Sequence, residues 1–253
     1  MENVYMRVSP VVLAALVLSM SGSAFAQEYV EFKSQQDRFT VVFPAQPKVT
    51  EITFTSQFDS VLPARVYSAD ADGGHYSVTV VDYSNIRAIA TEKAKKCPPG
   101  AEACSGTATD ASSTGAGYWK ADIAGAVMNA TWMLQQRDAK VTYVGWANMD
   151  LVEGNMVSLI NNKDKSRTSA AVYMHENKLY ILEGTAPAGF PVPDWFQQSI
   201  GWIDENGTGI RYLTIYHNGL PKPEIARRGG QGQAQGQGRG QGQGQGQGGQ
   251  PAR

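Results

Sequence analysis

The sequence predicts an α+β fold, an antiparallel β-sheet with helices packed on it. Between Arg38 and Tyr83, apolar and polar residues alternate in several short runs, and a period of two is typical of strands with one buried face. Two later segments carry apolar residues at helical spacing, and each is followed by alternating residues that are typical of strands. The short connections between successive strands favour antiparallel pairing in one shared sheet.

Five strands are expected before the first helix, each bounded by proline, glycine or polar turn residues. In the clearest of them, Phe39, Val41 and Phe43 share one face, and two prolines follow because proline cannot donate a hydrogen bond to a β-ladder. Glycines at 73–74 allow the positive φ angles of a tight turn. The expected strands cover 27–34, 38–43, 49–56, 62–69 and 76–81.

Three helices are expected, and the second is the longest. One stripe of its apolar residues repeats every three or four positions, so we expect it to pack on the sheet. Trp132 and Met133 lie off this stripe, which suggests that the helix is covered on a second side. Asp194 is a candidate cap or early acid of the third helix. The helices are expected over 86–96, 118–136 and 191–203, and the stripe comprises Trp119, Ile123, Val127, Ala130 and Leu134.

Four further strands and a short extended piece complete the domain. In the first of these strands, strict alternation places Val141, Tyr143 and Gly145 on one face and Val144 and Trp146 on the other. A hairpin follows later, around the turn at 175–177. These elements are expected at 141–149, 156–160, 168–174, 178–182 and 210–216.

The N-terminal segment 1–26 has the composition of a signal peptide. Arg7 supplies a positive charge, 11–20 is apolar, and a small-x-small site places cleavage between Ala26 and Gln27. The apolar run is too short to cross a bilayer, so we expect no integral membrane span in the mature chain. The segment predicts a periplasmic or secreted protein with a Gram-negative type of signal peptide.

Composition also separates the domain from a C-terminal tail. We expect residues 27–221 to form a single globular domain. The Gly/Gln-rich segment 222–253 has too few apolar residues to fold alone and is expected to be a disordered tail of low complexity. The formal net charge is −1, and the tail by itself is net basic, so residues 27–221 are mildly acidic. A mildly acidic domain argues against nucleic acid as a partner.

The chain contains two cysteines, Cys97 and Cys104. In an exported protein such a pair is expected to form a disulfide bond. A metal or redox pair is the alternative, and two prolines between the cysteines with no histidine nearby disfavour it.

No motif in the sequence specifies a reaction, so we expect no catalytic residue, cofactor or metal. Three sets of residues could still carry chemistry, although an ordinary surface role is favoured for each. They are His75, His175 and His217 as metal ligands or bases, Asp110, Ser112 and Ser113 as a nucleophile group, and Asp70, Asp72 and Asp82 as a Ca²⁺ site.

The run Arg38-Phe39-Thr40-Val41-Val42-Phe43-Pro44 resembles a strand motif of the Mog1/PsbP-like fold group, which includes many small exported bacterial proteins of uncharacterised function. The runs 177–182 and 195–200 are similar to the last strand and the closing helix of that group. The resemblance implies an antiparallel sheet with helices on its faces. Better-known members are accessory or binding proteins, a photosystem II extrinsic subunit and a Ran-binding factor. No functional residue is carried over, because neither binding motif is matched here.

Two functions follow as hypotheses. A non-catalytic envelope protein would bind an envelope protein or a ligand through exposed sheet or through C-terminal aromatic residues, and it would show an exposed apolar patch. An unrecognised periplasmic hydrolase would instead hold a serine or carboxylate within hydrogen-bond reach of a histidine in a cleft. The lack of a catalytic motif favours the first. The aromatic residues in question are Trp195, Trp202, Tyr212 and Tyr216.

Overall fold

The computed structural model describes residues 29–99 and 119–218. The predicted signal peptide and its cleavage site, the tail, Cys104, and the group of Asp110, Ser112 and Ser113 lie outside these residues. The elements, in order, are β1 (Val30–Ser34), β2 (Phe39–Phe43), β3 (Lys48–Thr55), β4 (Val61–Ala71), β5 (Gly74–Asp82), α2 (Ile86–Ala94), α4 (Trp119–Gln135), β6 (Ala139–Met149), β7 (Val152–Asn161), β8 (Arg167–His175), β9 (Lys178–Ala186), β10 (Gly201–Ile203) and β11 (Gly209–Ile210).

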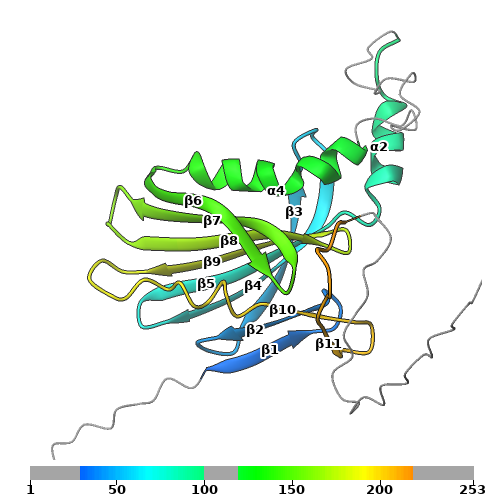
Figure 1. The fold of residues 1–253 in the computed structure, drawn as a ribbon. Helices are drawn as coiled ribbons and strands as arrows, with labels where there is room; N and C mark the ends of the chain where they lie inside the picture. The colour runs from blue at the N-terminus through cyan, green and yellow to red at the C-terminus, as the bar shows by residue number, and fades with distance from the viewer. Residues whose placement is uncertain (1–28, 100–118, 219–253) are drawn as a thin grey trace, which may run out of the picture.

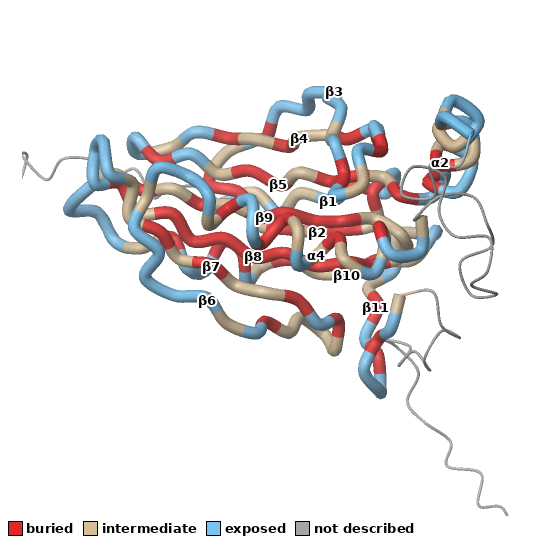
Figure 2. The backbone as a smooth tube through the Cα atoms, turned by 90° about the horizontal axis from the view of Figure 1, so that it is seen from above, coloured by how far each residue is buried: buried red, intermediate tan, exposed pale blue. Residues whose placement is uncertain are grey.

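A seven-stranded antiparallel sheet forms the centre of the domain (Figure 1), in the order β3-β4-β5-β9-β8-β7-β6. Two meanders, β3-β4-β5 and β6-β7-β8-β9, meet where β5 pairs with β9. The predicted α+β class and the antiparallel pairing are confirmed. Nearly all of β8 is buried, whereas β3 and β6 at the two edges are largely exposed (Figure 2).

A second, four-stranded sheet covers one face of the large sheet, in the order β1-β2-β10-β11 (Figure 1). The buried face of β2, Phe39, Val41 and Phe43, packs with Tyr67 and Tyr180 of the large sheet in one hydrophobic cluster. The prediction of one shared sheet is therefore wrong, because β2 pairs with β1 and β10 and not with β3.

The helix α4 covers the opposite face of the large sheet (Figure 1). Of the predicted stripe, Ala130 and Leu134 are buried, while Trp119 and Ile123 are only partly buried. The central sheet is thus covered on both faces, which explains why β8 lacks an exposed side.

The predicted helix over 191–203 is wrong. Residues 194–198 form turns, and 201–203 are the strand β10, in which Trp202 pairs with Phe39. The resemblance to a closing helix at 195–200 therefore fails as well. Asp194, expected as a helix cap, accepts a hydrogen bond from Ser169. In β10 the backbone N–H and C=O groups form hydrogen bonds with β2, whereas in a helix they would bond to each other.

A buried carboxylate joins the two sheets. Asp37, in the turn between β1 and β2, is fully buried and accepts hydrogen bonds from Arg65 and Tyr67 of β4. Lys178 of β9 lies 3.4 Å from the same carboxylate. Within the described ranges, neither helix is long and apolar enough to cross a membrane.

Candidate functional site

Large apolar side chains are exposed together on α4 and on β6, the next element along the chain. Trp146 is 63 % exposed and Trp132 is 56 % exposed, values unusual for the largest apolar side chain. We call this region the α4–β6 surface. It comprises Met128, Trp132 and Met133 of α4 and Val141, Val144 and Trp146 of β6.

A β-bulge decides which way the β6 side chains face. The register with β7 shifts between Val141 and Tyr143, so strict alternation fails there. Val141 pairs with Leu159 and Val144 pairs with Val157, and both partners belong to the cluster under α4. The predicted placement of Val141 with Tyr143 is therefore wrong, because the inserted Thr142 moves Val141 to the helix side.

Trp146 also lies on the helix side of β6. It pairs with Asn155 of β7, whose side-chain amide donates to Thr131 Oγ1 of α4 at 3.1 Å. Tyr143 points to the other side, where its ring lies over Gly145 and leaves no room for a Cβ there. Three exposed β6 side chains thus stand beside α4 and continue its apolar outer face.

Few charges interrupt the α4–β6 surface. From 123 to 135, α4 has no charged residue, and Lys140 is the one charged residue of β6. Asp122 of α4 is buried and accepts a hydrogen bond from Ser56. A surface rich in Trp and Met and poor in charge has the composition of a protein–protein interface core. The prediction that α4 is covered on a second side is not met among the described residues.

The three histidines lie in separate places. His75 is half-exposed and lies 2.7 Å from Asp70 at a surface turn. His175 is buried, bonded to Tyr212 at 2.7 Å, and stacked on Trp202. His217 lines a cavity described below. The carboxylate contact of His75 with Asp70 thus lies at a surface turn, and the hydrogen-bond partner of His175 is a tyrosine in the core.

The C-terminal aromatic residues do not form the exposed binding surface that the first hypothesis allowed. Trp202, Tyr212 and Tyr216 are buried, with 7 % exposure at most. Trp195 is 38 % exposed, and its ring packs edge-on against Tyr29. Trp202, Tyr212 and Tyr216 pack around His175, so these three aromatic residues belong to the core. In the sequence, the α4–β6 surface is indicated by Trp132 and Met133, which lie off the apolar stripe of the helix.

The proposed Ca²⁺ group does not assemble. Asp70 lies near the end of β4, opposite His75 of β5, whereas Asp82 lies at the far end of β5, 3.4 Å from Lys178. No cluster of three or more metal-ligating side chains occurs among the residues that the structure describes. Cys97 follows α2, and because Cys104 lies outside the described residues the disulfide stays a prediction.

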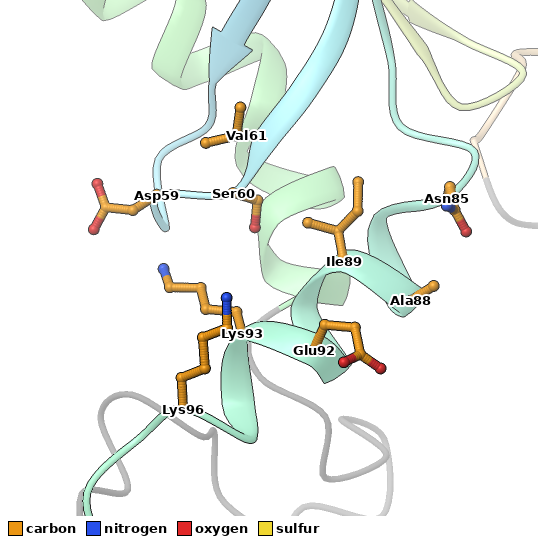
Figure 3. A pocket seen from close by; sticks show the side chains of 9 residues that line it. All are labelled: Asp59, Ser60, Val61, Asn85, Ala88, Ile89, Glu92, Lys93 and Lys96. Atoms are coloured by element: carbon orange, nitrogen blue, oxygen red, sulfur yellow. The ribbon is translucent and has the colours of Figure 1, made fainter.

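A cavity of about 430 Å³ lies between α2 and the loop that joins β3 to β4 (Figure 3). Lys93 and Lys96 both line it, and Lys93 donates to the main-chain oxygen of Phe58. Behind the loop, burial raises the pKa of Asp122, while hydrogen bonds from Ser56 and Ser60 oppose that rise. These contacts hold the loop against α4, so the cavity borders a structural junction.

A second cavity, of about 600 Å³, lies between the first half of α4, the turn from β8 to β9 and the chain segment after β11. Its apolar part is formed by α4 and Met174. Its polar part is formed by Lys120, Glu153, Asn177, His217 and Asn218.

No family model matches the sequence, and none of the curated proteins matches it. Among solved structures, the solution structure of cyanobacterial PsbP (CyanoP) from Synechocystis sp. PCC 6803 is similar, with 12 % sequence identity and a TM-score of 0.36 over 74 % of this chain and 99 % of that one. PsbP belongs to the fold group that the opening strand motif resembles. A likeness of this degree carries neither a partner nor a function over to this chain.

Proposed function

We propose that this chain is an exported, non-catalytic binding protein whose α4–β6 surface docks a protein partner of the cell envelope. The supporting observation is the set of exposed Trp, Met and Val side chains on two consecutive elements. Contiguous apolar surface of this kind on a folded domain is typical of an interaction site.

The residue types favour a protein partner over a lipid surface. Helices that lie on anionic membranes combine an apolar face with many lysines and arginines. Here α4 carries only Lys120 as a basic residue and β6 carries only Lys140. Tryptophan and tyrosine are enriched among the residues that dominate protein–protein binding energies, so Trp132 and Trp146 are the expected anchors.

Replacing both tryptophans with serine, W132S/W146S, is expected to lower recovery of a specific envelope protein at least about tenfold, because each anchor contributes about 2 kcal/mol or more. The measurement is quantitative affinity capture after mild cross-linking in envelope extract. Binding of the captured protein, once purified, is then titrated directly. A chain that ends at Pro221 should recover the partner as well as the full chain does, because the surface lies within the folded domain.

The matched control is V61S/L213S, which removes two apolar side chains of similar exposure elsewhere, 57 % and 58 %. This variant should capture the partner as the unaltered protein does. Both double variants should unfold at nearly the same denaturant concentration as the parent, since exposed substitutions usually change stability by about 0.5 kcal/mol or less. Equal capture by W132S/W146S and V61S/L213S would refute the proposed surface.

A further inference from the structure

The cavity of about 600 Å³ has the size of a small-molecule site and lies on a different part of α4 from the exposed tryptophans. Three α4 side chains one turn apart, Trp119, Ile123 and Val127, form an apolar floor with Met174 of β8. Tyr216, which is otherwise buried, supplies a further wall.

Two opposite charges line this cavity without being paired. Lys120 Nζ lies 5.6 Å from the centroid of the Trp119 ring, and Glu153 lies on β7. Among the described residues, neither Lys120 nor Glu153 has a salt-bridge partner within 4.0 Å. A ligand with a single charge would meet one favourable and one unfavourable group, whereas a ligand with both charges satisfies each.

A rigid amide pair lies on the same rim. Asn218 Nδ2 donates to Asn177 Oδ1 at 2.8 Å, and the main-chain amide of Asn177 donates to Asn218 Oδ1 at 2.8 Å. Tyr216 accepts a hydrogen bond from the main-chain amide of Glu176 at 2.8 Å, which fixes the segment 216–218 against the turn between β8 and β9. The polar rim is therefore pre-organised, which lowers the entropic cost of binding.

We propose that this cavity binds a short unblocked peptide with apolar side chains. Its ammonium group lies toward Glu153, its carboxylate toward Lys120, and its side chains on the floor of Trp119, Ile123 and Val127. Carboxamides such as those of Asn177 and Asn218 are suited to a peptide bond, because they offer both a donor and an acceptor. The volume excludes long peptides and admits one of about two residues.

The test is calorimetric titration of the full-length exported protein with L-leucyl-L-leucine, followed in parallel by tryptophan fluorescence. K120Q and E153Q should each weaken binding about tenfold, because each removes one charge-assisted contact. The matched controls K140Q and E51Q remove one charge of each sign from exposed strand positions elsewhere and should leave the affinity unchanged. A124W, which places a large side chain at the exposed α4 position lining the cavity, should abolish binding.

The blocked peptide N-acetyl-leucyl-leucinamide distinguishes the charges from the apolar floor. We expect it to bind at least about a hundredfold more weakly, because it lacks both charged ends. Equal affinity for the two peptides, or no heat and no fluorescence change at millimolar dileucine, would overturn the proposal. Loss of binding in W132S/W146S with retention in A124W would also overturn it, because the peptide would then occupy the α4–β6 surface. The results with K120Q, E153Q, A124W and the blocked peptide do not bear on the capture experiment, because that experiment replaces Trp132 and Trp146 instead.

Discussion

Replacing Asp37 with alanine is expected to lower the free energy of unfolding by about 3–5 kcal/mol, because it leaves two cations without their buried partner. The Asp37 side chain has no exposed surface. Arg65 Nε donates to Asp37 Oδ2 at 2.6 Å, and a second nitrogen of the same guanidinium donates to Oδ1. Tyr67 donates to Oδ2 at 2.6 Å. Since Asp37 belongs to one sheet and its donors to the other, the network fixes how the sheets pack.

The same carboxylate predicts a pH dependence. Burial would raise the pKa of Asp37, but hydrogen bonds from Arg65 and Tyr67 and the charge of Lys178 outweigh it, so the pKa is lowered below 3.8. In the unfolded chain the carboxylate has its ordinary pKa. The stabilisation is therefore present above about pH 4 and is lost as the pH falls through the folded-state pKa.

Urea unfolding at pH 7 and at steps down to pH 2 measures both the loss of unfolding free energy and its pH dependence. The difference in unfolding free energy between the parent and D37A should be largest at neutral pH and should shrink as the pH falls below 3.8. The control is D70A, which removes an exposed carboxylate beside His75 and should cost about 0.5 kcal/mol or less. If D37A unfolds at the same urea concentration as D70A, the network does not hold the sheets together.

Periodicity predicted most strands and α4 because each of these is decided by nearby residues. The strand β2 shows this, since its alternation of Phe39, Val41 and Phe43 needs only a buried face. Which sheet receives that strand depends on partners far along the chain. Trp202, the residue opposite Phe39, lies in a segment whose apolar spacing also fits a helix.

The α4–β6 surface could not be predicted from the sequence for a related reason. Sequence spacing identifies apolar side chains but does not show whether another element covers them. The sequence therefore predicts that Trp132 is covered, whereas it is exposed in the described structure. The bulge at Thr142 is equally invisible to a pattern of strict alternation. The opposite error concerns Trp202, Tyr212 and Tyr216. The sequence suggests them as an exposed binding surface, but they lie in the core around His175.

Trp202 tests directly whether residues 201–203 form the strand β10. Its side chain is 1 % exposed, its ring stacks on His175 at 4.6 Å and meets Tyr180 at 5.1 Å, and its Nε1 donates to the main-chain oxygen of Met149 at 2.9 Å. W202A should lower the free energy of unfolding by about 3–5 kcal/mol, because it leaves a large cavity between the sheets. W202F should cost less, since it keeps most of the volume and loses the hydrogen bond.

The matched control is W195A, seven residues earlier, where the ring is 38 % exposed and packs on Tyr29 alone among the described aromatic rings. We expect a cost of about 1 kcal/mol for this variant. A helix over 191–203 lying on the surface would make the two tryptophans nearly equivalent, whereas the β10 strand makes Trp202 part of the core. Denaturant unfolding of the two alanine variants separates these arrangements, and equal midpoints would contradict the pairing of β10 with β2.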